Sequence, residues 1–137
     1  MKIILSLLLL QFFALKQCNS DTLNSTIEYS IFTRGTYKKI LIEEQKMYFS
    51  NERESKGTEI EVSKEDWTKI IALFEAIELE KIQGIKGESS NRATDRSFHA
   101  KFSVIKNGKT YKTNEFDHGN PPKEVADLVN LISKFLK

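Results

Sequence analysis

The chain has 137 residues, of which 29% are charged and 39% hydrophobic, and its formal net charge is +2. This length is enough for one small domain with a single core. Lys2 and Lys16 are the only charged residues among the first 20, so the rest of the chain carries 19 basic and 19 acidic residues. Because a nucleic-acid-binding protein needs a clear basic surplus, this balance argues against nucleic acid as a partner.

The first 20 residues have the pattern of a signal peptide. Lys2 supplies a positive charge, and residues 3–15 form an apolar run broken only by Ser6 and Gln11. These 13 residues fit the hydrophobic region of a signal peptide. They are too few to span a bilayer, which takes about 20 residues. We therefore expect export, with residues 1–20 as the signal peptide.

Cys18 is the only cysteine, so it cannot form an internal disulfide. Its position resembles that of the lipidated cysteine of bacterial lipoproteins, where the signal peptidase cuts just before a cysteine that carries a diacylglycerol. Leu15 suits the third position before the cut, whereas Lys16 and Gln17 replace the usual small residues. The alternative is ordinary cleavage, for example after Ser20. The protein is thus expected to be a lipoprotein anchored in the membrane, or else periplasmic or secreted.

The next segment predicts a polar tether at residues 21–25, followed by a single domain over residues 26–137. Apolar residues then alternate with polar ones, which is the period of a β-strand. Turns at Arg34-Gly35, where glycine tolerates positive φ, and at Glu44-Gln45 produce a three-stranded meander. One face of this meander is expected to form the core, with Ile27, Tyr29, Ile31, Ile40, Ile42, Met47 and Phe49.

The same register places apolar residues on the opposite face of the meander: Phe32, Tyr37, Leu41 and Tyr48. Together they are a candidate partner-binding patch. Two structural alternatives remain. The residues could be scattered surface apolars, which are common in monomeric proteins, or the tether or a loop could cover them. A register slip of one residue would exchange the two faces.

Beyond the meander, the chain predicts a helix and then a long loop. Ser63 is a suitable N-cap, and Asp66 stands three residues later, as in a capping box. An apolar stripe at helical spacing predicts a helix from about Lys64 to Glu75, with Trp67, Ile70, Ile71 and Phe74 on its buried side. Residues 83–95 are rich in glycine and small polar residues and predict a mobile loop.

Asn107-Gly108 lies between two alternating runs and predicts a hairpin with a tight two-residue turn. The register sets Val104 opposite Tyr111. It places on the core face Phe98, Ala100, Phe102 and Val104, and on the solvated face His99, Lys101 and Ser103. A closing helix follows, indicated by apolar residues at helical spacing: Val125, Leu128, Val129, Ile132 and Phe135.

Continued to its end, the hairpin register places Asp117 on the inward side and His118 on the outward side, diagonal to His99. These are the only two histidines of the chain. His99, Asp117 and His118 are therefore a weak candidate site for a metal or for acid–base chemistry. A zinc site needs three or four ligands, and Asp95 is the only further candidate. The chain has no HExxH motif, no cysteine pair and no nucleophile elbow.

A structural interpretation accounts for the same stretch. Gly119 permits positive φ, and Pro122 suits the first position of a helix. Asp117 or Asn120 could accept hydrogen bonds from free N–H groups at that helix start. On this interpretation, residues 115–125 turn the corner between a strand and a helix.

Taken together, these features resemble small uncharacterised exported domains of Bacteroidota-type bacteria. The resemblance rests on the export signal, the Thr33-Arg34-Gly35 turn, the capped helix, the Asn-Gly hairpin and the helix after residues 117–122, and it covers most of residues 25–137. It implies the fold and the compartment. It transfers no active-site residue, because its motifs are turns and caps.

The expected fold is a two-layer α+β domain: an antiparallel sheet of about five strands, formed by a meander and a hairpin, with two helices on one face. The expected function is a non-catalytic envelope module that binds an unknown protein or glycan and needs no cofactor. Such a lipoprotein would also bind the membrane through the lipid on Cys18. The alternative is a small metal-dependent or acid–base hydrolase that uses His99, Asp117 and His118.

Overall fold

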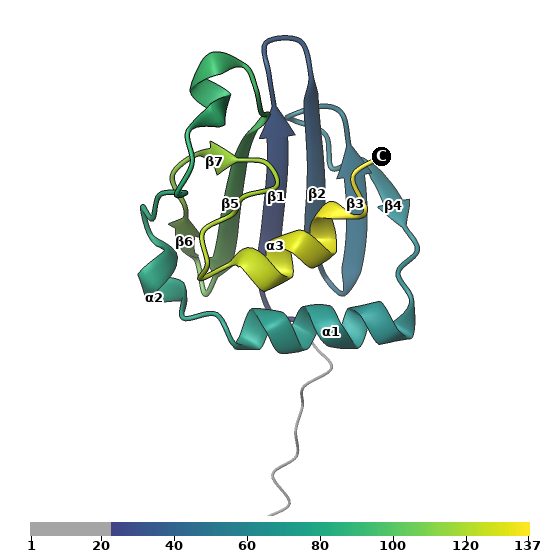
Figure 1. The fold of residues 1–137 in the computed structure, drawn as a ribbon. Coiled ribbons are helices and arrows are strands. Elements are labelled where there is room, and N and C mark those ends of the chain that lie inside the picture. Colours follow the sequence, from purple (N-terminus) through teal and green to yellow (C-terminus); the bar gives the residue numbers. More distant parts are fainter. Residues whose placement is uncertain (1–22) are drawn as a thin grey trace, which may run out of the picture.

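The computed structural model describes residues 23–137 and has the expected α+β architecture (Figure 1). Seven strands form one antiparallel sheet, in the order β4-β3-β2-β1-β5-β6, with β7 also paired to β5. The two strands beyond the expected five are short: β4 has three residues and β7 has two. The elements are β1 (Thr26–Phe32), β2 (Tyr37–Glu43), β3 (Lys46–Ser50), β4 (Thr58–Ile60), α1 (Lys64–Glu75), α2 (Leu79–Ile82), the 3₁₀ helix η1 (Asn91–Thr94), β5 (His99–Lys106), β6 (Lys109–Lys112), β7 (Phe116–Asp117) and α3 (Ala126–Ser133).

The register of the meander is confirmed, and so is that of the hairpin near its turn, although the expected pairing of Ala100 with Glu115 is wrong. Ile27 pairs with Ile42, Ile40 with Phe49, and Val104 with Tyr111. The turns at Glu44-Gln45 and Asn107-Gly108 have the positive φ values that a tight hairpin turn requires. At the first turn the expected reason is wrong. Gly35 is not among the residues with positive φ, and the turn closes through a hydrogen bond from Thr33 N–H to the Thr36 carbonyl.

The meander and the hairpin join through β1 and β5, whose pairing sets Tyr29 beside Phe102. The N-terminal strand thus lies in the middle of the sheet (Figure 1). The segment between β4 and β5 crosses the sheet as α1, α2 and η1. Strand β1 is therefore paired along its length with a neighbour on each side, β2 and β5.

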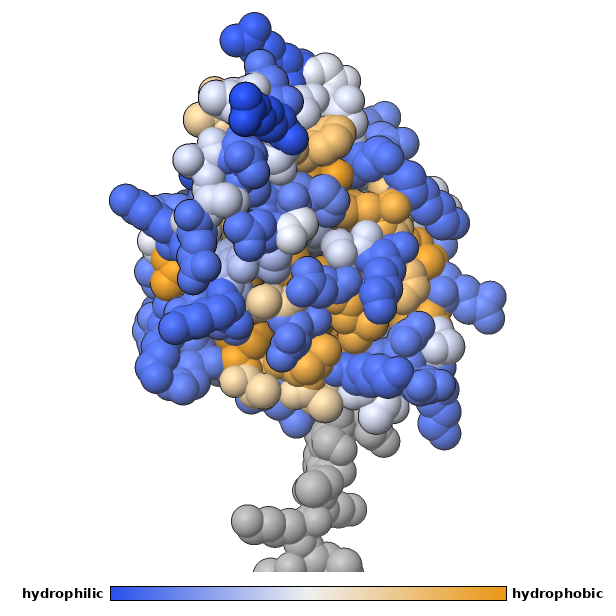
Figure 2. Space-filling view, viewed as in Figure 1, coloured by the Kyte–Doolittle hydropathy of each residue, from blue (hydrophilic) through white to orange (hydrophobic). Residues whose placement is uncertain are grey.

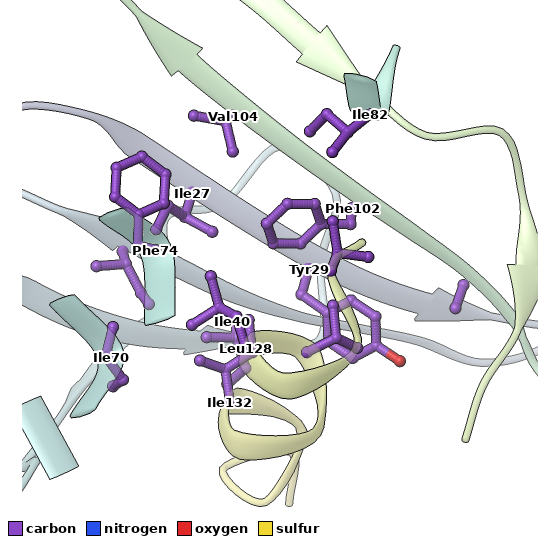
Figure 3. Packing of buried hydrophobic residues seen from close by; sticks show 14 of the residues in the cluster. Ile27, Tyr29, Ile40, Ile70, Phe74, Ile82, Phe102, Val104, Leu128 and Ile132 are labelled. Atoms are coloured by element: carbon purple, nitrogen blue, oxygen red, sulfur yellow. The ribbon is translucent and has the colours of Figure 1, made fainter. Parts of the chain in front are cut away.

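Helices α1 and α3 cover one side of the sheet, which we term the inner face (Figure 1). Ser63 caps α1 as expected, its Oγ accepting from the N–H of Asp66 at 3.1 Å. Leu128 and Ile132 of α3 pack against the sheet together with Ile70 and Phe74 of α1 (Figure 3). On the helical side, apolar residues gather around α1 and α3, and hydrophilic residues occupy most of the remaining surface (Figure 2).

The inner face holds the expected core. Six of the seven predicted meander residues are buried and Phe49 is partly buried, while β5 adds Ala100, Phe102 and Val104. Trp67 is partly buried and packs against this core. Burial of each large apolar side chain contributes about 1.5–3 kcal/mol, so this face carries most of the hydrophobic stabilisation.

Three features of the domain differ from the prediction. The predicted tether is not free throughout, because Leu23 is buried in the core and its backbone N–H and C=O bond the side chain of Gln45. Phe98, expected in the core, precedes β5 and is 36% exposed, since it lies beyond the paired end of β1. Helix α3 begins at Ala126 rather than near Pro122, because turns occupy the residues between them. The predicted signal peptide and Cys18 lie outside the described residues.

Candidate functional site

The outer face of the sheet, opposite the helices, carries the four residues of the predicted patch. Phe32 pairs with Tyr37, and Leu41 pairs with Tyr48, so the four side chains share this face as the register predicted. Each is half-buried. We refer to Phe32, Tyr37, Leu41 and Tyr48 as the aromatic patch.

The loop between β3 and β4, residues 51–57, packs against the aromatic patch. The guanidinium carbon of Arg53 lies 4.5 Å from the ring centre of Tyr37 and 5.2 Å from that of Phe32. Lys56 Nζ lies 4.4 Å from the ring centre of Tyr48. Cations are attracted to aromatic ring faces by the ring quadrupole. A loop therefore covers part of the patch, which was one of the structural alternatives.

Lys39, a residue of β2, bonds this loop to the sheet. Its side chain projects from the outer face of β2, is only 5% exposed, and donates from Nζ to the carbonyl of Arg53 at 2.9 Å. Ser50 adds two hydrogen bonds of 2.9 Å to the backbone of Glu52. The outer face is thus ordered by polar bonds and ring–cation contacts, whereas apolar packing orders the inner face.

A groove of about 400 Å³ runs along the outer face beside the patch, between β1, β5 and β6. Glu115 lies in its wall and accepts hydrogen bonds from His99 Nδ1 at 2.9 Å and from Lys101 Nζ at 3.1 Å. These two bonds, that of His99 first, lower the pKa of Glu115 against the opposing effect of burial. Glu28 and Lys112 also line the groove. The groove is thus lined by equal numbers of acidic and basic side chains.

The strand that forms β6 and β7 contains one extra residue, which corrects the predicted end of the hairpin. Ser103 pairs with Lys112, but Ala100 pairs with Phe116 and not with Glu115. The bulge follows from a long-range contact, because Asn114 N–H donates to the Ile85 carbonyl at 2.9 Å instead of joining β5. Each strand residue after the bulge therefore lies on the face of the sheet opposite to the predicted one.

Asp117 accordingly lies on the outer face, where it pairs with His99 and is 2% exposed. Its carboxylate accepts from the hydroxyl of Ser89, from the N–H groups of Asn91 and Arg92 at 2.8 and 2.9 Å, and from Arg92 Nη1 at 3.1 Å. Burial alone would raise the pKa of Asp117. These hydrogen bonds outweigh that effect and hold the pKa well below its ordinary value. Asp117 thus anchors η1 and its flanking loop, and it does not cap the start of α3.

His118 lies on the inner face, at the rim of the core. Its Nδ1 is 2.7 Å from the hydroxyl of Tyr29, whose ring lies inside the apolar cluster while the hydroxyl points out of it (Figure 3). Burial lowers the pKa of His118 and raises that of Tyr29. The lowered pKa of His118 favours the neutral imidazole, and the raised pKa of Tyr29 keeps the phenol protonated, so the bond joins two neutral groups. Phe98 packs edge-on against the imidazole ring, with 6.4 Å between ring centres.

The structure therefore does not assemble the weak candidate site. His99 and Asp117 share the outer face but engage different partners, and His118 lies on the inner face. The oxygens of Asp117 already accept hydrogen bonds from Ser89, Asn91 and Arg92. Within residues 23–137, no group of three or more His, Cys, Asp or Glu side chains is placed to hold a metal ion. Gly119 has the expected positive φ of 89°, so the stretch does turn a corner.

The structure also brings the arginines together at one end of the sheet, which was not predicted from the sequence. All four arginines of the chain lie in three loops there: Arg34, Arg53, Arg92 and Arg96. A pocket of about 410 Å³ lies among these loops, lined by Phe32, Thr33, Arg34, Arg92, Ala93, Asp95 and His99. The only available signal was the use of arginine in predicted loops of a chain whose other cations are all lysines.

Comparisons with protein-family models, curated proteins and solved structures find no match to this chain. No helix among residues 23–137 is long and apolar enough to cross a membrane.

Proposed function

We propose that this protein is a non-catalytic binding module of the cell envelope, and that a partner protein docks on the aromatic patch and the adjoining cations. One observation carries the proposal. Both α1 and α3 cover the inner face, so neither of these two helices covers the half-buried rings on the outer face. Tyr, Phe and Arg are enriched in protein interfaces, and Tyr and Arg dominate binding hot spots.

A protein partner suits this surface better than a glycan. Aromatic residues bind sugars through an open ring face, and here Arg53 lies over Tyr37 while Lys56 lies over Tyr48. Rings with attached cations instead present a mixed apolar and charged surface. Such a surface fits a protein segment with both apolar and acidic side chains.

The envelope location is part of the proposal and rests on the sequence. It is supported by the apolar run at residues 3–15 and by Cys18 just beyond it. Mass spectrometry of the protein from membranes would detect a diacylglycerol on Cys18, and the Cys18→Ala variant should lose membrane association. Membrane retention of both forms would contradict lipid anchoring and leave the outer-face proposal intact.

The hydrolase alternative lacks a supporting geometry, because His118 and Asp117 project to opposite faces of the sheet and are bonded to Tyr29 and Arg92. We therefore place the function on the outer face.

The test is cross-linked capture of partners from the native envelope by the whole protein. The parent is compared with Tyr48→Ser and Phe32→Ser, and with Ile105→Ser as the matched control. Ile105 is an outer-face residue that is 46% exposed at the other end of β1, where it pairs with Thr26. All variants are first shown to be folded by circular dichroism.

We expect one partner to be captured by the parent and by Ile105→Ser and lost with both patch variants. Equal capture by all four proteins would move the binding surface away from the patch. If Tyr48→Ser and Phe32→Ser both unfold, these rings are structural and the proposal fails.

A further inference from the structure

We infer that the pocket between the β1–β2 turn and η1 binds a carboxylate, supplied by an acidic side chain of the partner protein. This inference deepens the proposed function by naming the chemistry of the partner. We refer to the pocket lined by Phe32, Arg34, Arg92, Asp95 and His99, with its flanking residues, as the arginine pocket.

The first support is the placement of arginine. Phe32 pairs with both Tyr37 and His99, so the β1–β2 turn and the segment before β5 leave the sheet at the same end. Arg53 reaches this end from the third loop, because its guanidinium lies over Phe32. The planar guanidinium matches the two oxygens of a carboxylate and is less strongly hydrated than a lysine ammonium, so arginine is suited to recognising such groups.

The second support is that only one of the two arginines lining the pocket is held by hydrogen bonds to the protein. Arg92 is held in place, because its Nη1 donates to Asp117 at 3.1 Å and to the Ser89 carbonyl at 2.8 Å. Arg34 is exposed, and among the ion pairs of residues 23–137 it has no carboxylate partner. Arg34 is thus available to bind a ligand, whereas Arg92 is a fixed part of the pocket lining.

The third support concerns the charge of the ligand. Asp95 lines the same pocket and would repel a dianion more strongly than a monoanion. A phosphate monoester carries a charge of about −1.5 to −2 at neutral pH, whereas a carboxylate carries a single charge. The pocket therefore favours a carboxylate over a phosphate.

The fourth support is an apolar wall suited to the stem of an acidic side chain. The rings of Phe32 and His99 are stacked, with 5.3 Å between their centres and 23° between their planes. Phe32 belongs both to this wall and to the aromatic patch, so the pocket adjoins the proposed docking surface. An acidic residue next to an apolar one could occupy both at once.

The position of the pocket also suits a partner. Strand β1 has seven residues, from Thr26 to Phe32, so Thr26 and the arginine pocket are separated by about 20 Å along the strand. The pocket therefore lies at the opposite end of β1 from Thr26, the first residue of the sheet.

The direct test measures binding of a fluorescein-labelled glutamate hexapeptide to the whole protein by fluorescence anisotropy at low ionic strength. The variants are Arg34→Gln and Arg34→Lys, and Lys106→Gln is the matched control. Lys106 is exposed at the opposite end of β5, so its change removes the same charge away from the pocket. Unlabelled acetate and inorganic phosphate are used as competitors.

We expect Lys106→Gln to bind the peptide as the parent does and Arg34→Gln to bind it about tenfold more weakly or worse, since the variant loses hydrogen bonds between two charged groups. Arg34→Lys should recover only part of the loss, because it keeps the charge but loses the paired donors. Equal binding by Arg34→Gln and Lys106→Gln, or none by the parent, would overturn the inference. Stronger competition by phosphate than by acetate would overturn the assignment to a carboxylate.

The partner experiment separates this inference from the proposed function. If Tyr48→Ser abolishes partner capture while Arg34→Gln does not, the docking surface stands and the arginine pocket is not part of it. If the peptide binds through Arg34 while Tyr48→Ser leaves partner capture unchanged, the pocket stands and the aromatic patch does not.

Discussion

The two faces of the sheet are built from the same strands but are ordered by different forces. The inner face is covered by α1 and α3 and consists of aliphatic and aromatic side chains with almost no exposure. The outer face buries polar groups instead, such as Ser30, Lys39 and Ser50, and its rings are covered only by a loop. This difference implies that stability resides on the inner face, and that outer-face residues can be changed to serve recognition.

The largest effect on stability is expected in β5, which has side chains on both faces of the sheet. Phe102 and Ile105 both belong to β5, but Phe102 is fully buried on the inner face and Ile105 is 46% exposed. Phe102→Ala should lower the free energy of unfolding by about 3–5 kcal/mol. Ile105→Ala should change it by about 0.5 kcal/mol or less. Urea denaturation with a common slope measures both changes, and similar values for the two would contradict the division between the faces.

Asp117 is an outer-face residue on which stability should depend, and it sharpens the comparison. Asp117→Asn should cost about 1–3 kcal/mol, because an amide cannot accept all the hydrogen bonds that Ser89, Asn91 and Arg92 donate. Hydrogen exchange should become faster at the N–H groups of Asn91 and Arg92. The control is Asp127→Asn at an exposed position of α3, and equal protection in both variants would argue against anchoring by Asp117.

The same residue predicts a dependence on pH. The pKa of Asp117 in the folded protein is depressed below its ordinary value of 3.8, so below pH 3.8 the unfolded chain takes up a proton that the folded protein does not. The stabilisation is therefore complete above that pH and is lost as the pH falls towards the folded value, at up to about 1.4 kcal/mol per pH unit. In Asp117→Asn this part of the slope should be missing from unfolding curves measured at pH 4 and below, and an unchanged slope would contradict it.

What could be predicted from the sequence was set by local chemistry. The Asn107-Gly108 turn determines its own register, and the Ser63 cap with its apolar stripe defines α1 to the residue. The positions of the aromatic patch followed in the same way. The pairing of β1 with β5 has no local determinant, because it joins segments about 75 residues apart in the chain.

The errors at the candidate site have the same origin. A hydrogen bond between Asn114 and Ile85 inserts one residue into the strand, and this exchanged the predicted faces of Asp117 and His118. Nothing near Asn114 in the sequence encodes its distant partner. The arginine pocket could not be predicted for the same reason, since the β1–β2 turn and the η1 segment that line it are far apart in the sequence.

A smaller effect is expected where the inner face meets a polar group. Tyr29→Phe removes the hydroxyl that bonds His118 Nδ1 at 2.7 Å and should cost about 0.5–1.5 kcal/mol. His118 is also harder to protonate in the folded protein, so its contribution to stability is present above the ordinary value of 6.5 and is lost as the pH falls below it. Unfolding curves between pH 7 and 5 should show this loss in the parent but not in His118→Gln. An identical pH dependence in both proteins would mean that His118 is not buried as neutral imidazole.

The smallest change in stability is expected in the loop that covers the outer face. This prediction tests whether the contacts of Arg53 with the aromatic rings are weak. Arg53→Gln removes the cation over Tyr37 and Phe32 but leaves the backbone carbonyl that Lys39 bonds. Exposed cation–π contacts contribute about 0.5–1 kcal/mol, so stability should fall by about that amount. Amide exchange should accelerate in residues 51–57 and remain unchanged in β5, whereas Arg53→Lys should keep part of the effect, because it keeps the cation but loses the planar guanidinium. A loss several times larger, or faster exchange throughout the sheet, would show that this loop is part of the stable core and that the two faces are not independent.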